Sequence, residues 1–179
     1  MSFDSATGAG SFDCLFLDNT AGSGVSVTVA DDDGGAGTGT VTVLVANVAP
    51  TVTLVGPPAA NEGEAADYEF TASDPGADTF VLDDLDCGAE GTLTSLTFDA
   101  ATGAGTFNCT YADDSPLSTI SLTLSDDDGG SGSASNSFAV SNVPPVVELT
   151  GPAAVDEGDT ATYVISVFEP GAEIGRAHV

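Results

Sequence analysis

The sequence repeats itself at intervals of 95 residues, and this repeat limits the folds open to the chain more than any other feature. Positions that lie 95 residues apart align without a gap, so that Cys14 corresponds to Cys109 and Asp31 to Asp126. The stretch FDSATGAGSFDC, for instance, aligns with FDAATGAGTFNC. Self-similarity at a fixed period indicates a tandem array in which every copy forms the same structural unit.

The alignment divides the chain into one complete repeat and two partial ones. We expect residues 1–49 to be the C-terminal half of a truncated repeat, residues 50–144 to be a complete repeat, and residues 145–173 to begin a third. The match ends there, and residues 174–179 contain the only Arg and the only His of the sequence. We therefore interpret residues 174–179 as a non-native tail and assign no function to them.

Apolar and polar residues alternate within the complete repeat, which is the pattern of half-buried β-strands. Tyr68, Phe70 and Ala72, for example, fall on one face of a single strand. Seven segments show this pattern, and turns rich in Gly, Pro, Asp and Asn separate them: TVTLV, DYEFTAS, TFVLDDL, LTSLTF, GTFNCTY, STISLTL and NSFAVSN. Seven such strands in one unit are typical of an immunoglobulin-like antiparallel β-sandwich. The predicted fold class is therefore all-β, with Ig-like sandwiches in tandem.

The two ends of the complete repeat resemble a known module. The segments that carry the similarity are NVAPTVTLVGP, NEGE, YEFTASDPGAD and YADDSPLSTISLTLSDDDGGSGSASNSFAVSNVPP. They resemble PKD-type repeats, which are Ig-like modules arranged in arrays on bacterial and archaeal surface proteins. The central WDFGDG-like segment of that family is replaced by LDDLDCGAEG, and the chain has no Trp. The resemblance implies a divergent PKD-like repeat of a secreted or surface-anchored prokaryotic protein.

The charge balance excludes two classes of partner. Asp and Glu total 28 against a single Lys or Arg, which gives a net charge of −27. Such a chain repels nucleic acid and anionic lipid surfaces, so we expect neither a nucleic-acid partner nor membrane insertion. The first twenty residues also lack the basic and apolar regions of a signal peptide. For a protein that resembles secreted ones, this predicts a fragment whose true N-terminus is missing.

Two of the three cysteines lie in the complete repeat. In an acidic, Ig-like, repeat-built chain, Cys87 and Cys109 predict a disulfide. Two buried free thiols are the alternative. Cys14 is the copy of Cys109, but the copy of Cys87 would precede residue 1, so we expect Cys14 to have no partner. A disulfide favours an extracellular or cell-surface location.

Carboxylates gather in the turns that an Ig-like topology brings to a single end of the sandwich. The turn after the second strand, SDPGAD, and the turn after the sixth, DDDGG, would meet beside the linker that enters the repeat, opposite the DN turn of the preceding repeat. A hard cation with about six to eight oxygen ligands fits such a junction. We predict a calcium site there, with the ligands Asp74, Asp78, Asp126, Asp127, Asp128, Asn47, Asp18 and Asn19.

Two other interpretations of the same aspartates stay open. Asp is favoured beside Gly in turns because its side chain hydrogen-bonds the local backbone. The second interpretation is that the aspartates belong to a general acidity suited to a saline habitat. The DDDGG motif does not have the spacing of an EF-hand loop, so the prediction of calcium depends on the clustering that the fold implies.

No set of residues suggests catalysis, and we expect a protein that is not an enzyme. The only His lies in the tail, and paired carboxylates recur in every repeat, as a glycosidase pair would not. We predict a spacer, stalk or adhesion segment of a larger surface protein. Its partners would be neighbouring repeats of the same chain and a surface polysaccharide or protein. The alternative is a carbohydrate-binding accessory module of a secreted enzyme, which would need exposed aromatic residues.

Overall fold

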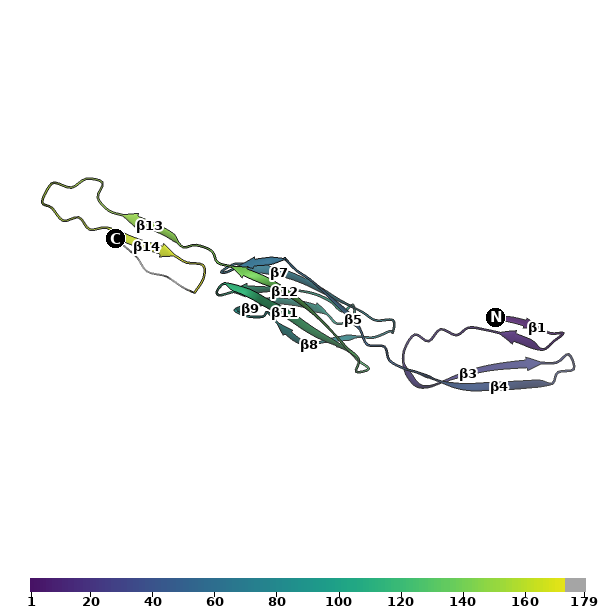
Figure 1. Cartoon of the computed structure of the whole chain (residues 1–179). Helices are drawn as coiled ribbons and strands as arrows, with labels where there is room; N and C mark the ends of the chain where they lie inside the picture. The colour runs from purple at the N-terminus through teal and green to yellow at the C-terminus, as the bar shows by residue number, and fades with distance from the viewer. Residues whose placement is uncertain (173–179) are drawn as a thin grey trace.

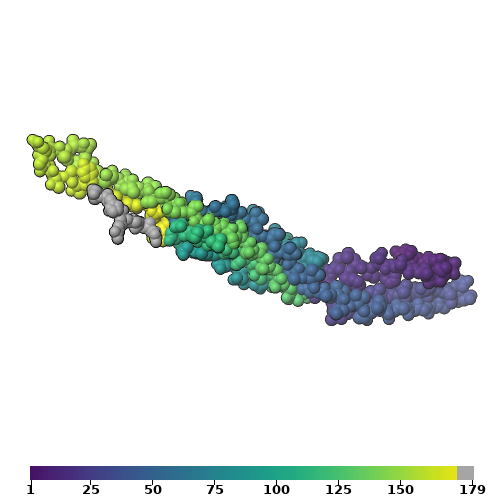
Figure 2. All heavy atoms as spheres, viewed as in Figure 1, coloured from purple at the N-terminus to yellow at the C-terminus, as the bar shows by residue number. Residues whose placement is uncertain are grey.

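The computed structural model describes residues 1–172, and every regular element in this part of the chain is a β-strand. Three parts follow one another along an elongated molecule: an N-terminal segment, a central sandwich and a C-terminal segment (Figures 1 and 2). None of the described residues forms a helix that is long and apolar enough to cross a membrane. The predicted tail, residues 174–179, lies outside the described residues.

The complete repeat folds into two four-stranded sheets that pack face to face (Figure 1). One sheet has the strand order β5 (Thr51–Val55), β7 (Ala65–Ser73), β10 (Ala104–Tyr111) and β9 (Gly91–Asp99). The other has the order β6 (Ala59–Asn61), β12 (Ser131–Ser141), β11 (Ser115–Asp126) and β8 (Phe80–Asp86). Neighbouring strands are antiparallel, apart from the parallel pair β6 and β12. The prediction of an all-β, Ig-like sandwich is confirmed.

Each of the seven predicted segments forms a strand, and β6 is an eighth that the sequence pattern did not reveal. Its three residues, AAN, are too few to show an alternation. It exists because the edge of β12 is open to it, with Ala60 opposite Val140 in the parallel register. Pairing with a distant edge is a tertiary event, which a local pattern does not report.

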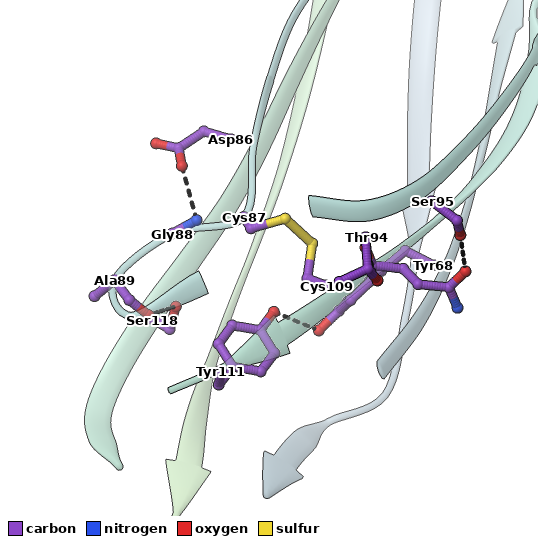
Figure 3. Close-up of a disulfide and its surroundings, with 11 residues drawn as sticks. Tyr68, Asp86, Cys87, Gly88, Ala89, Thr94, Ser95, Cys109, Tyr111 and Ser118 are labelled. Carbon is purple, nitrogen blue, oxygen red and sulfur yellow. Dashed lines mark hydrogen bonds between the residues drawn. A yellow bond between two sulfur atoms is a disulfide. The ribbon is translucent and has the colours of Figure 1, made fainter. Parts of the chain in front are cut away.

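The core lies between the two sheets and is rich in aromatic residues. The burial of β7 alternates strictly, which places Tyr68 and Phe70 inside. Tyr68 stacks on Phe107 with the ring centroids 5.1 Å apart, and Tyr111 meets Phe138 edge-on at 5.5 Å. The hydroxyl groups of the two tyrosines hydrogen-bond each other at 3.0 Å (Figure 3). This bond satisfies two polar groups that burial would otherwise leave costly.

The predicted disulfide between Cys87 and Cys109 is confirmed (Figure 3). Cys87 follows β8 of one sheet and Cys109 lies in β10 of the other, so the bond joins the two sheets covalently. The Cα atoms are 5.9 Å apart, and both residues are buried. Cys14 is exposed and free.

The flanking segments form hairpins and strand pairs that copy parts of the sandwich. In the N-terminal segment, β1 (Ser2–Asp4) pairs with β2 (Ala9–Ser11), and β3 (Thr20–Ala30) pairs with β4 (Ala36–Val45). In the C-terminal segment, β13 (Val146–Thr150) pairs with β14 (Val164–Phe168). The register irregularity between Thr20 and Ser23 recurs between Ser115 and Ser118, at the same repeat position. Similar sequences at the same repeat position therefore form the same strand pairing.

Candidate metal centre at a repeat junction

Two acidic turns of the sandwich meet at the end where the chain enters it. The turn between β7 and β8 covers residues 74–79, and the turn between β11 and β12 covers residues 127–130. The backbone N–H of Thr79 donates to Oδ1 of Asp127 at 2.9 Å and joins the two turns. The side chain of Asn47, in the linker between β4 and β5, donates from Nδ2 to Oδ2 of Asp126 at 2.9 Å.

The turn between β7 and β8 folds its two aspartates over a glycine. Oδ1 of Asp74 accepts the backbone N–H of Gly76 at 2.9 Å, which is the local bond that favours Asp at the start of a turn. A Cβ atom on Gly76 would collide with the carboxylate of Asp78. The absence of a side chain at this position therefore lets the Asp78 carboxylate lie against the turn.

In the DDDGG turn, two of the three aspartates have structural roles. Asp126 is buried, and its Oδ1 accepts the backbone N–H groups of Asp128 at 3.0 Å and Gly130 at 2.7 Å. The hydrogen bond from Asn47 and these backbone donors hold the pKa of Asp126 below its usual range, although desolvation opposes them. Asp127 accepts the backbone N–H of Thr79 and so connects this turn to the turn between β7 and β8. For both residues, turn chemistry accounts for the hydrogen bonds.

The remaining carboxylates face one another across the junction. Asp18, Asp78 and Asp128 each offer a carboxylate oxygen, and these oxygens all lie within 4.8 Å of one another. Two oxygens bound to one calcium ion, each at about 2.3–2.6 Å, lie no more than about 5.2 Å apart. The observed separations are therefore compatible with a shared calcium ion.

The carboxylates of this junction have no basic side chain to neutralise them in the described part of the chain. The Oδ2 atoms of Asp74 and Asp78 are shielded from solvent and have no hydrogen-bond partner there. Residues 1–172 contain no Lys, Arg or His. Shielded carboxylate oxygens without donors or a counter-charge are costly, so a proton or an added cation is needed at this place.

The electrostatics of Asp78 reflect this crowding. Desolvation raises the pKa of Asp78 to about 6, with help from the adjoining Asp74 carboxyl group and from the negative charges of Asp74, Asp18 and Asp126. A carboxyl group with these neighbours holds a proton more tightly than an isolated one. The same surroundings would favour a divalent cation once the proton is released.

A cavity of about 110 Å³ opens beside these residues. Its polar lining comes from Asp18, Asn19, Asn47, Asp74 and Asp78. A water molecule occupies about 30 Å³ in the liquid, so the cavity has room for an ion that keeps part of its water shell.

The eight predicted ligands thus divide into three groups. Asp18, Asp74, Asp78 and Asp128 gather at the junction, Asn19 and Asn47 line its cavity, and Asp126 and Asp127 hold the turns. A second acidic group, at the opposite end of the sandwich, consists of Glu62, Asp113 and Asp114. Our sequence reasoning missed it, although the repeat offset that matches Asp18 to Asp113 was a signal that could have revealed it.

Comparison with known proteins shows a distant structural likeness. No family model matches the chain, and no curated protein is similar to it. Among solved structures, the chain is similar to the PKD domain of an M14-like peptidase from Thermoplasmatales archaeon SCGC AB-540-F20. The sequence identity is 18% and the TM-score is 0.45, and the match covers 53% of this chain and 98% of that chain. No family membership follows from these comparisons.

Proposed function

We propose that this chain belongs to a non-catalytic, extracellular tandem-repeat segment of a larger secreted or surface protein. The segment acts as a spacer or stalk, or as an adhesive surface, and calcium at the repeat junctions stiffens it. The observation that carries this proposal is the junction itself. Carboxylates from two consecutive repeats face one another there, with no basic side chain anywhere in residues 1–172.

The shape of the molecule supports the spacer role. The repeat and its flanking segments lie end to end (Figure 2), so each added repeat lengthens the molecule. The linker between β4 and β5 spans only residues 46–50, and the bond from Asn47 to Asp126 holds it against the sandwich. The bending of such an array is set at its junctions, where an ion bridging two repeats has most effect.

The aromatic residues favour a spacer over a carbohydrate-binding module. Sugar-binding surfaces present exposed aromatic rings, and the complete repeat holds its aromatic side chains inside. Six are buried and Phe98 is partly buried against the same core: Tyr68, Phe70, Phe80, Phe107, Tyr111 and Phe138.

Thermal unfolding of residues 1–179 in calcium, magnesium or chelator tests the calcium proposal. About 0.5 M NaCl is used throughout because it already screens the general charge repulsion. For extracellular affinities of about 10⁻⁴ to 10⁻³ M, calcium at about 1 mM should stabilise the fold by about 0.4 to 1.4 kcal/mol per site. Magnesium should do less, since it requires tighter octahedral geometry.

The variant with Asp78→Asn and Asp128→Asn should lose the calcium response of this junction. The matched control replaces two exposed aspartates in the middle of β8, Asp83→Asn and Asp84→Asn, and should keep it. Equal effects of calcium and magnesium at high salt would contradict the proposal. So would a full calcium response in the junction variant.

A further inference from the structure

The opposite end of the sandwich holds the most unusual carboxylate of the described residues. Glu62 lies in the turn after β6 and is only 2% exposed. Its Oε1 accepts the backbone N–H of Val143 at 2.7 Å, and its own N–H donates to the carbonyl of Ser141 at 3.1 Å. Both bonds hold the linker that leaves β12.

The charge of Glu62 has no partner in the described part of the chain. No hydrogen-bond donor within residues 1–172 reaches its second oxygen, Oε2, and these residues contain no Lys, Arg or His. Burying a carboxylate is costly unless hydrogen bonds, a proton or a counter-charge compensate its lost hydration. Oε2 is therefore the atom of Glu62 that is open to a cation.

Two further carboxylates converge on Glu62. Asp113 and Asp114, from the turn between β10 and β11, each place an oxygen within 4.8 Å of the other and of the Glu62 carboxylate. A cavity of about 300 Å³ adjoins the group and is also lined by Asn142 and Glu169. Each of these side chains offers a carboxylate or amide oxygen, the type of ligand that calcium prefers.

The repeat relates this group to the first junction position by position. Asn142 is the copy of Asn47, and Glu169 is the copy of Asp74. The other matches along the same offset are Asp18 with Asp113, Asn19 with Asp114 and Gly76 with Gly171.

The glycine match extends to its surroundings. A Cβ atom on Gly171 would lie 2.7 Å from Oε2 of Glu62, and one on Gly76 would collide with the Asp78 carboxylate. Each junction thus has a Pro-Gly turn, Pro75-Gly76 at the first and Pro170-Gly171 at the second, and its glycine leaves room for a carboxylate oxygen.

We infer that Glu62, Asp113 and Asp114 form a second calcium site, at the junction between the complete repeat and residues 145–172. Asn142 and Glu169 complete its lining. This inference rests on the proposed function, because it extends calcium binding from one junction to the next. It also adds a buried ligand, Glu62, which belongs to the complete repeat and therefore precedes this junction.

A calcium titration of the whole chain, followed by NMR of its backbone amides, tests each site separately. Residues 1–179 are titrated with calcium chloride in about 0.5 M NaCl, which suppresses non-specific screening effects. Two groups of amides should respond and saturate: one around Gly63 and Val143, the other around Gly76 and Gly130. Magnesium chloride should shift both groups less at the same concentration.

The variant Glu62→Gln keeps an oxygen that can accept the Val143 N–H but removes the charge. It should weaken calcium binding at the Gly63 and Val143 group by about tenfold or more, because affinity follows the charge of the ligand set. The response around Gly76 should not change. If this variant unfolds, Asp113→Asn with Asp114→Asn gives the same test at less buried positions.

The outcomes separate this inference from the proposed function. A response around Gly76 alone overturns the second site and leaves calcium binding at the first junction in place. A response around Val143 alone supports the second site and contradicts the first. No response at either group overturns both. The control Asp83→Asn with Asp84→Asn should leave both responses unchanged.

Arg176, which lies outside the described residues, is the one Lys or Arg of the sequence and could compensate Glu62 instead. The variant Arg176→Gln should leave the calcium response around Val143 unchanged. A response that appears only in this variant would assign the counter-charge to Arg176 and overturn the inference.

Discussion

Two aspartates from different turns of the same junction, Asp126 and Asp78, have opposite environments, and these set their roles. Asp126 receives N–H groups from Asn47, Asp128 and Gly130, and its pKa is lowered. Asp78 faces other carboxylates in a shielded position, and its pKa is raised to about 6. Hydrogen-bond donors favour the charged form of a carboxyl group, whereas desolvation and like charges disfavour it. The first residue therefore builds the turn, and the second is suited to bind a cation.

The raised pKa of Asp78 predicts a pH dependence with a definite sign. The folded state holds a proton on Asp78 up to pH about 6, whereas in the unfolded chain the carboxyl group has its ordinary pKa of 3.8 and releases the proton near that pH. Without calcium, this group makes stability fall as the pH rises from about 4 to about 6, because the folded state binds more protons.

The variant Asp78→Asn isolates this effect from the titration of the other carboxylates. Without calcium, it should be more stable than the wild type at pH 7, with a smaller difference at pH 4.5. With calcium at pH 7 the order should reverse, because the ion needs the ionised carboxylate. Melting curves at both pH values measure the difference. The same order with and without calcium at pH 7 would argue against a shared ion.

The disulfide predicts a clear loss of stability when it is removed. Replacing Cys87 and Cys109 together by Ala should cost about 3 kcal/mol, because the bond restrains a loop of this length in the unfolded chain. Cys14→Ala is the matched control and should change little, since Cys14 is exposed and free. Urea unfolding without reductant measures both. An unchanged midpoint in the double variant would show that the bond adds no stability.

At the scale of elements, the same repeat position can be exposed in one strand and buried in another. Val27 and Val29 of β3 are 40% and 44% exposed, whereas their copies in β11, Leu122 and Leu124, are both 0% exposed. The hairpins β3–β4 and β11–β12 have matching registers. Hairpin pairing is local, but burial requires a facing sheet, which the central sandwich has.

This difference predicts how separate pieces of the chain behave. Residues 50–144 should unfold in one cooperative thermal transition, because they contain both sheets of the sandwich. Residues 2–49 should show no cooperative transition, since isolated hairpins are at best marginally stable in water. Circular dichroism of the two peptides during heating distinguishes them. A cooperative transition for residues 2–49 alone would refute the repeat boundaries.

At the scale of the whole molecule, shape and charge act against each other. The parts lie end to end (Figure 1), and the net charge of −27 repels them from one another. The repulsion is strongest at junctions, where carboxylates of two repeats meet. A divalent ion there would replace repulsion by a shared attraction and restrict bending.

Calcium should therefore narrow the range of shapes in solution. Small-angle X-ray scattering of residues 1–179 in about 0.5 M NaCl should show a better-defined maximum dimension in calcium than in chelator. The change should be reduced by Asp78→Asn with Asp128→Asn, and kept by the β8 control, Asp83→Asn with Asp84→Asn. Identical scattering in calcium and chelator would mean that the junctions are not stiffened.

Much of the architecture could be predicted from the sequence, because its signals are periodic or covalent. The two-residue alternation identified seven strands, and the 95-residue offset related the segments. The presence of Cys87 and Cys109 in one repeat of an acidic, Ig-like chain indicated their disulfide. Such signals can be recognised from the order of the residues alone, without knowledge of the folded structure. They also placed the turns holding Asp74 and Asp126 at one end of the sandwich.

The tertiary structure alone decided which side chains are shielded and which remain free. β6 forms because the edge of β12 is open to it, and Glu62 is buried because its turn closes over the outgoing linker. Asp126 and Asp128 lie two positions apart in one motif, yet N–H groups surround the first while the second faces Asp18. Burial and hydrogen bonding depend on atoms that are distant in sequence, and no local pattern encodes their approach.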